Sequence, residues 1–196
     1  MLGLTLKNEY LGIMIQPKEN TLLIADPFLR DDNFIRSVIY LCCHDQEGTL
    51  GFKLNEYSGY SINQMIKGLN HCTMPVYVGG PVANDTIHFL HTIPNLIPDG
   101  QCIGNNIYWG GDFSIVKNLM RKNMLNAGNI RFFLGYSGWD KDQLQSELDE
   151  KTWLTAASSE KIVFHTQADI VWKESVRLLG PDFLPLIHYP IDPQLN

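Results

Sequence analysis

The stretch IRSVIYLCCHDQEGTLGFKLN, residues 35–55, decides the fold because it predicts a β-hairpin in the middle of a sheet. Residues along its first arm alternate between two strand faces, and both faces are apolar from Val38 to Cys43. A strand that is apolar on both sides is expected to be central and covered on each face. The polar run 45–48 predicts a turn, and LGFKLN at 50–55 predicts the returning arm.

Working outward from this hairpin, apolar runs and turn residues predict the remaining elements. Further strands are expected at 21–27, 75–81, 86–91, 131–136 and 161–164. Helices are expected at 61–69, 112–128, about 140–150 and 168–179, and 92–111 is expected to be irregular. Asp112 should cap the start of the helix 112–128, and Gly128 should end it. Strands and helices are mixed without strict alternation, which favours an α+β fold with a mixed sheet over a doubly wound fold.

Composition predicts one domain spanning 1–196 in a soluble, cytoplasmic protein. The chain has 196 residues, of which 44% are hydrophobic and 18% charged, and its net charge is −6. The acidic balance disfavours nonspecific attraction to DNA or acidic membranes. The four cysteines contain no CxxC pair, and Cys42 and Cys43 are adjacent within an apolar run, which indicates reduced thiols. We expect no signal peptide and no membrane span.

The segment GYSGW, residues 135–139, nearly matches the G-x-S-x-G nucleophile elbow of serine hydrolases. That elbow needs a glycine two residues on either side of the serine, whereas Trp139 stands where the second glycine should be. Only His165 and His188 follow as partners for Ser137, and no motif marks either of them. We therefore interpret GYSGW as a strand-to-helix corner and keep a serine hydrolase as a minor alternative.

Two glycines in the segment GGPV, residues 79–82, invite comparison with a phosphate-binding loop. No GxGxxG or GKS/T pattern follows, and Pro81 removes an N–H donor, so a rigid corner is the simpler interpretation. Gly79 and Gly80 could also permit the close approach of a ligand or of another backbone segment. Both possibilities stay open on the sequence alone.

Metal and nucleic-acid sites have weak support. His88 and His91 would point to opposite sides of a strand, so we expect no metal site. A modest basic stripe, formed by Lys117, Arg121 and Lys122, lies on the helix 112–128 without any recognisable DNA-binding motif. A transcriptional regulator that contacts DNA directly is therefore kept as an alternative and is not the favoured reading.

Polar residues gather at the predicted strand ends around the central hairpin. Arg36 and Ser37 precede the apolar run of the first arm, and His44 and Asn55 lie at the ends of the two arms. Residues in such places often line a cleft. Ordinary turn chemistry and one salt bridge are the simpler explanation of these four residues, and the cleft is kept as the alternative.

Three long blocks in the same order resemble the YqgE/AlgH family of bacterial proteins. They are LLIADPFLRDDNFIRSVIYLCCHDQEGTLGFKLN (22–55), PVYVGGPV (75–82) with FLH (89–91), and FFLGYSGWDKDQLQSELDEKTWL (132–154). The later IVFHTQADIVWKESVRLLG (162–180) fits the C-terminal part of that family. The resemblance implies a single α+β domain whose mixed sheet forms a partly closed, barrel-like body flanked by helices. Some members are called transcriptional regulators, and the family has no agreed enzymatic reaction.

The resemblance also marks departures and candidate site residues. Ser137 replaces the usual alanine of GYAGW, and Gln145 replaces a usual glutamate. We expect a non-enzymatic protein that binds a small molecule or a protein partner, without cofactor, metal or catalytic residue. The predicted ligand-binding cleft joins the three blocks and consists of Arg36, Ser37, His44, Asn55, Gly79, Gly80, Pro81, Tyr136, Ser137, Trp139 and Gln143.

Overall fold

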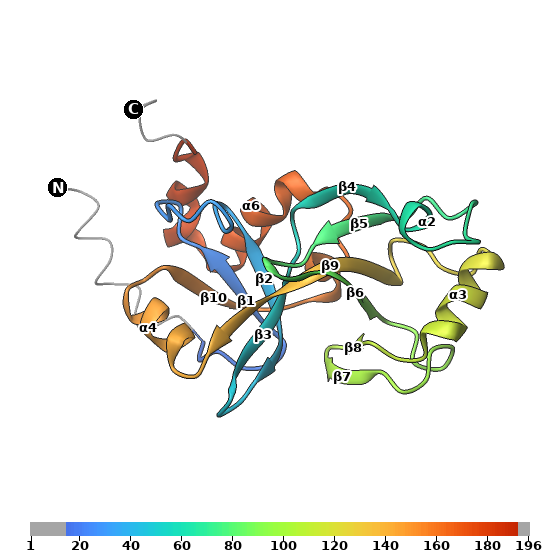
Figure 1. Cartoon of the computed structure of the whole chain (residues 1–196). Helices are drawn as coiled ribbons and strands as arrows, with labels where there is room; N and C mark the ends of the chain where they lie inside the picture. Colours follow the sequence, from blue (N-terminus) through green and yellow to red (C-terminus); the bar gives the residue numbers. More distant parts are fainter. Residues whose placement is uncertain (1–14, 192–196) are drawn as a thin grey trace.

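The computed structural model describes residues 15–191, and the expectation about a signal peptide falls on residues outside this range. The elements follow one another in the order β1 (Thr21–Ala25), β2 (Val38–His44), β3 (Gly48–Lys53), β4 (Tyr57–Ser61), α2 (Ile62–Met65), β5 (Pro75–Val78), β6 (Val82–His91), β7 (Gln101–Gly104), β8 (Ile107–Trp109), α3 (Phe113–Arg121), β9 (Ile130–Asp140), α4 (Gln143–Asp149), β10 (Trp153–Ala157), α5 (Glu160–Val163), α6 (Ala168–Leu178) and the 3-10 helix η2 (Pro181–His188). The molecule is drawn in Figure 1.

All strands join one ten-stranded sheet, in the order β10-β1-β2-β3-β9-β6-β8-β7, with β5 pairing with β9 and β4 pairing with β5. The pair β5–β9 is parallel and the other pairs are antiparallel, so the sheet is mixed. The sheet curls into a partly closed body with helices around it (Figure 1). The predicted α+β class is thus confirmed.

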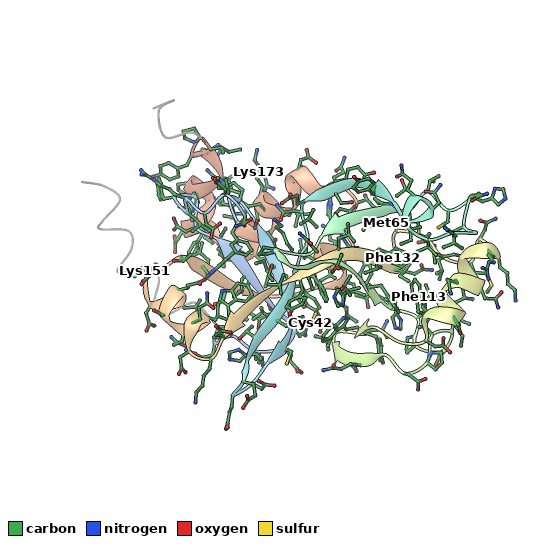
Figure 2. All side chains as sticks on the ribbon, viewed as in Figure 1. Cys42, Met65, Phe113, Phe132, Lys151 and Lys173 are labelled. Atoms are coloured by element: carbon green, nitrogen blue, oxygen red, sulfur yellow. The ribbon has the colours of Figure 1, made fainter. Side chains whose placement is uncertain are left out.

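The long strand β9 joins two halves of this sheet. Its first part pairs with β5 on one side and β6 on the other, whereas its last four residues pair with β3. On one half, α6 and η2 pack over β1 and β2. On the other half, α3 packs against β6 and β9, and Phe113, Met65 and Phe132 gather there (Figure 2).

The predicted central hairpin is confirmed. Val38, Tyr40 and Cys42 of β2 belong to the apolar cluster that α6 covers. Ile39 and Leu41 belong to a second cluster on the opposite face, whose other buried members come from β1, β9, α4 and β10. The continuous apolar run, with apolar residues on both strand faces, therefore did predict a strand that is buried on both sides.

Two predicted elements were wrong and two strands were not predicted, because short segments take their structure from their neighbours. The region 92–111 contains β7 and β8, which pair with each other while β8 also pairs with β6. The run at 161–164 lies in the helix α5, which follows the N-cap Ser159; a four-residue apolar run does not distinguish a strand from a helix. The structure also adds strand β4 at Tyr57–Ser61 and strand β10 at Trp153–Ala157.

The predicted cap of α3 is confirmed, but its predicted end at Gly128 is wrong. The Asp112 carboxylate accepts hydrogen bonds from the backbone N–H groups of Ser114 and Ile115, at 2.8 and 3.3 Å. The helix ends at Arg121, with Lys122 as its C-cap, and the next residue, Asn123, has a φ of 54°. Asparagine tolerates this left-handed backbone conformation, so it can end a helix without glycine.

Candidate functional site

The segment GYSGW is not a strand-to-helix corner, which corrects the interpretation made from the sequence. Strand β9 continues through it to Asp140, and residues 137–140 pair in register with residues 48–51 of β3. Gly135 has a φ of 62°, so the strand bends there without ending. Glycines that allow a bend within a strand and glycines that allow a turn look the same in a sequence.

The two glycine motifs meet at this bend, where the backbone of the β5–β6 connection comes close to that of β9. A Cβ atom on Gly79 would lie 2.2 Å from the Gly135 carbonyl oxygen, and one on Gly80 would lie 2.3 Å from the Ser137 nitrogen. Gly79 N–H donates to the Leu134 carbonyl at 2.7 Å. Gly79 and Gly80 therefore permit the close approach of another backbone segment, which was one of the two alternatives left open by the sequence. We call this contact the glycine crossing.

Ser137 lies inside the glycine crossing and is fully buried. Its hydroxyl donates to the Gly79 carbonyl at 3.0 Å, so the proton is held by a carbonyl and not by a base. A nucleophilic serine needs an adjacent base and access to substrate. The geometry gives Ser137 a structural role, while the neighbouring Pro81 is exposed and Tyr136 is half-buried.

Arg36, Ser37 and Asn55 meet at the start of β2. The Asn55 side chain accepts from Val38 N–H at 2.9 Å and donates to the Arg36 carbonyl at 2.7 Å, which fastens the end of β3 to β2. The Arg36 guanidinium lies 4.1 Å from the Trp172 ring centroid and donates to the Tyr189 carbonyl at 2.7 Å. Burial lowers the pKa of Arg36, and the nearby Asp26 opposes that shift.

Trp139 and Gln143 belong to a different contact, centred on Glu147 of α4. The indole N–H groups of Trp139 and Trp153 both donate to Glu147 Oε2, at 2.9 and 2.7 Å. Gln143 donates to Glu147 Oε1 at 3.0 Å.

His44, on the exposed end of β2, forms a 2.7 Å hydrogen bond with Thr49 of the neighbouring strand. The structure thus brings the predicted residues together in smaller groups, and their common cleft stays a prediction.

A shallow pocket, with accessible space for about one water molecule, lies elsewhere, between the starts of β5 and β9 and the loop after α5. Its apolar and aromatic wall consists of Met74, Pro75, Tyr77, Ile130 and Phe164, with Ala127 beside them. Its polar lining is Arg131, His165 and Thr166. None of the residues predicted as site residues lines this pocket. Apolar walls around a few polar groups are typical of ligand sites.

Arg131 is the unusual member of this lining because its charged side chain is only 4% exposed. Its Nη1 donates to the Val163 and His165 carbonyls at 2.9 and 2.7 Å, and Nη2 donates to the Leu54 carbonyl. Its guanidinium carbon lies 3.7 Å from the Tyr77 ring centroid. Within residues 15–191, Nε is a buried donor that has no hydrogen-bond acceptor.

The electrostatics of the pocket favour negative charge. Burial lowers the pKa of Arg131 to about 10, with the nearby Tyr77 opposing the shift, so the side chain remains protonated at neutral pH. Its described acceptors are neutral carbonyls, and no carboxylate belongs to the pocket lining. A buried cation without an anionic partner is costly unless something else compensates its charge.

Neither the metal nor the DNA alternative gains a built site. Residues 15–191 contain no group of three or more histidine, cysteine or acidic side chains placed to hold a metal ion. His88 and His91 occupy opposite faces of β6, as the period of a strand predicts, with His88 among the rings of Phe52, Trp109 and Tyr136. Arg121 and Lys122 are exposed at the end of α3. No helix in the part of the chain that the structure describes is long and apolar enough to cross a membrane.

Sequence reasoning missed Arg131, although a signal for it exists. Arg131 opens the apolar run RFFLGY and lies two residues before Phe133, so both side chains share one face of the strand. Phe133 is fully buried, which makes burial of the arginine predictable from the alternation. The carbonyl partners and the pocket come from distant segments and could not be predicted in this way.

Comparisons with known proteins match almost the whole chain. The sequence model of the family described as AlgH-like matches residues 22–184. A UPF0301 protein of Cytophaga hutchinsonii is 39% identical over 176 residues, which cover 89% of this chain and 97% of the relative. A UPF0301 protein of Chlorobaculum parvum is 37% identical over 179 residues, covering 91% and 96% respectively.

Two solved structures share the fold. A crystal structure of a Corynebacterium diphtheriae protein has a TM-score of 0.77 at 19% identity and covers 90% of this chain and 94% of that one. The solution structure of the AlgH protein from Pseudomonas aeruginosa has a TM-score of 0.70 at 24% identity and covers 90% and 98%. These likenesses support the fold, and the sequence matches establish the family. The resemblance noted from the sequence is confirmed: the chain belongs to the AlgH-like family.

Proposed function

We propose that this protein is a non-enzymatic binding protein and that its ligand site is the pocket lined by Arg131. The buried guanidinium with its unpaired Nε–H carries this proposal, because such a donor is costly to leave unpaired. The pocket has accessible space for about one water molecule, so a ligand would insert a single small group there, with lining side chains moving aside for anything larger. A regulatory role would follow if occupancy alters the contacts of the α5–α6 loop, whose carbonyls Arg131 holds.

The cysteines support the expectation of a reducing, cytoplasmic environment. All four are free thiols, and Cys42 and Cys72 are buried. Disulfides are rare in reducing compartments, where thiols such as these persist. Cytoplasmic placement is therefore retained as part of the proposal.

A thermal-shift screen with mixed metabolites tests the binding function. The variant Ala127→Phe places a large ring at the pocket and leaves every hydrogen bond of Arg131 in place. Ala157→Phe is the matched control, because Ala157 is exposed at the end of β10 and does not line the pocket. A ligand at 100 times its Kd would stabilise the wild type by about 2.7 kcal/mol.

The proposal predicts that such a ligand stabilises the wild type and Ala157→Phe but not Ala127→Phe. Equal stabilisation of all three proteins would place the site elsewhere and contradict the proposal. An empty screen combined with salt-sensitive retention of duplex DNA would favour the DNA-binding alternative through Lys117, Arg121 and Lys122.

A further inference from the structure

The hairpin of β7 and β8 is joined to the sheet mainly near its base. β8 pairs with β6 at two positions, Leu90 with Trp109 and His91 with Tyr108. Among the described strands, β7 pairs with β8 alone. The hairpin begins beside α3 and reaches toward the half of the molecule formed by β1, β2 and β3 (Figure 1). Closure of the body on this side therefore depends on side chains and not on a strand ladder.

Glycines flank the base of this hairpin. Gly100 precedes β7, and Gly110 and Gly111 follow β8 with φ values of 72° and 120°. The buried His91 holds the base in place. Its Nδ1 accepts the Ile93 N–H, so Nε2 carries the proton and donates to the Gly110 carbonyl at 3.1 Å. Backbone hinges are formed by a few such residues at the ends of an element, and glycine changes its φ at little cost.

The tip of the hairpin is the two-residue turn Asn105–Asn106, which contacts segments far away in the sequence. Both residues have a positive φ, 50° and 59°, as a type I′ turn requires. Asn105 Nδ2 donates to the Ser158 carbonyl at 3.0 Å and to Asn20 Oδ1 at 3.4 Å. Asn106 Nδ2 donates to Glu160 Oε1 at 3.4 Å. We call these contacts the tip latch, because they join the hairpin to the start of β1 and to the β10–α5 connection.

The hairpin covers the inner side of β2. Ile103 of β7 and Ile107 of β8 are buried in the same apolar cluster as Tyr40 and Cys42 of β2, and Cys42 is labelled in Figure 2. Burial raises the pKa of Tyr40, and the thiols of Cys42 and Cys102 raise it further, so Cys102 of β7 lies near Tyr40. Movement of the hairpin away from the sheet would therefore expose this part of β2.

We propose that the β7–β8 hairpin is a hinged strap, which opens about Gly100 and Gly110–Gly111 when the tip latch breaks, while the rest of the sheet stays folded. The strap is closed at rest, because Ile103 and Ile107 are buried under it, and its open form is a minor, reversible state. The latch consists of polar contacts of two exposed asparagines, which water can replace on opening. This device does not depend on the pocket lined by Arg131.

Native-state hydrogen exchange in low concentrations of urea separates such an opening from global unfolding. In the wild type we expect the protected amides within 101–109 to exchange faster than those of β2 and β3. They should also respond less to urea, because opening the strap exposes less surface than unfolding the protein. The same protection and the same urea dependence in both segments would mean that the hairpin opens only with the whole protein, and the inference would be wrong.

Two variants test the latch. Asn105→Gly removes the side chain and keeps the left-handed backbone of the turn, whereas Asn105→Asp keeps a side chain of similar size that has no N–H to donate. We expect exchange within 101–109 to become at least about threefold faster in both variants. Asn123→Gly, at an exposed residue with a φ of 54° at the end of α3, is the matched control and should change nothing. Acceleration in neither variant, or in Asn105→Gly alone, would contradict the latch.

Alkylation of Cys42 by iodoacetamide tests what the strap covers. Peptide mass spectrometry of Cys43→Ser protein follows Cys42 without its neighbouring thiol. We expect Cys42 to react with the small urea dependence of the hairpin amides, and faster by the same factor when Asn105→Gly is added. A Cys42 that reacts only with the urea dependence of β3 would show that opening of the hairpin does not expose β2, which would overturn the proposed strap.

Discussion

The glycine crossing and the Arg131 pocket lie on the same strand, β9, and differ in what they leave available for chemistry. At the crossing, Gly79 and Gly80 bring two backbones together, and the Ser137 hydroxyl is buried and bonded. At the pocket, Arg131 is equally buried, but one of its donors is unpaired. The crossing is conspicuous in the sequence, whereas the pocket depends on a single arginine in an apolar run.

The two regions show that an unusual residue can have a steric explanation, as at the glycine crossing, or an electrostatic one, as at Arg131. Glycine at the crossing satisfies a steric requirement, and its motif says nothing about a ligand. A buried charge without an opposite charge has no such steric explanation, which is why the proposed ligand site lies at Arg131. Four substitutions can break or sharpen the comparison, and they follow from the largest expected effect to the smallest.

Gly79→Ala should be the most damaging, because the new Cβ would lie 2.2 Å from the Gly135 carbonyl oxygen and backbone must move. We expect the free energy of unfolding in urea to fall by about 3 kcal/mol. Gly128→Ala is the matched control, since its Cβ would meet only the Asn126 side chain, at 3.2 Å. A loss of less than about 0.5 kcal/mol in Gly79→Ala would show that the crossing tolerates a side chain.

Arg131→Met should cost about 2 kcal/mol in the same urea measurement, because it leaves the Val163, His165 and Leu54 carbonyls without their donor. Removing the buried charge recovers part of its desolvation cost, so the loss is smaller than at the crossing. Arg177→Met, at an exposed residue paired with Glu174, is the control and should change stability by less than about 0.5 kcal/mol. An Arg131→Met protein as stable as the wild type would show that the hydrogen bonds from Arg131 to these three carbonyls do not stabilise the fold.

Glu147→Gln should cost about 1 kcal/mol, because the two indoles lose a charged acceptor but keep a neutral one. Tryptophan fluorescence should report the change together with urea unfolding, since Trp139 and Trp153 both donate to Glu147. Glu150→Gln on the exposed end of α4 is the matched control. Equal behaviour of the two variants would mean that these indoles do not hold α4 to β9 and β10.

His88→Phe should have the smallest effect at neutral pH and a larger one in acid. Burial lowers the pKa of His88, so the unfolded chain takes up its proton first as the pH falls through about 6.5. Stability contributed by neutral His88 is therefore lost below that pH, and phenylalanine should reduce the loss between pH 7 and 5. His71→Phe, at an exposed residue, is the control. If the pH profile of unfolding in His88→Phe is unchanged from that of the wild type, His88 is not the group whose protonation destabilises the folded protein in acid.

Sequence alone predicted the parts of the fold that depend on periodic burial. The hairpin of β2 and β3 was readable because both faces of its first arm are apolar. The sequence did not predict β7, β8 or α5, because pairing and packing with other segments decide the structure of such short segments. The glycines suggested either a corner or a close backbone contact, and only the course of β9 shows which applies at Gly79. Arg131 could be predicted as buried, but its carbonyl partners, which come from Leu54 just after β3 and from the α5–α6 region, could not.

The most direct test is a backbone amide map of the ¹⁵N-labelled protein, recorded with and without a saturating ligand from the metabolite screen. The account predicts that the signals that move belong to the pocket, at Tyr77, Ile130, Arg131 and His165, and that those of Gly79, Gly80 and Ser137 stay in place. A map in which the glycine crossing moves and the Arg131 region does not would contradict it.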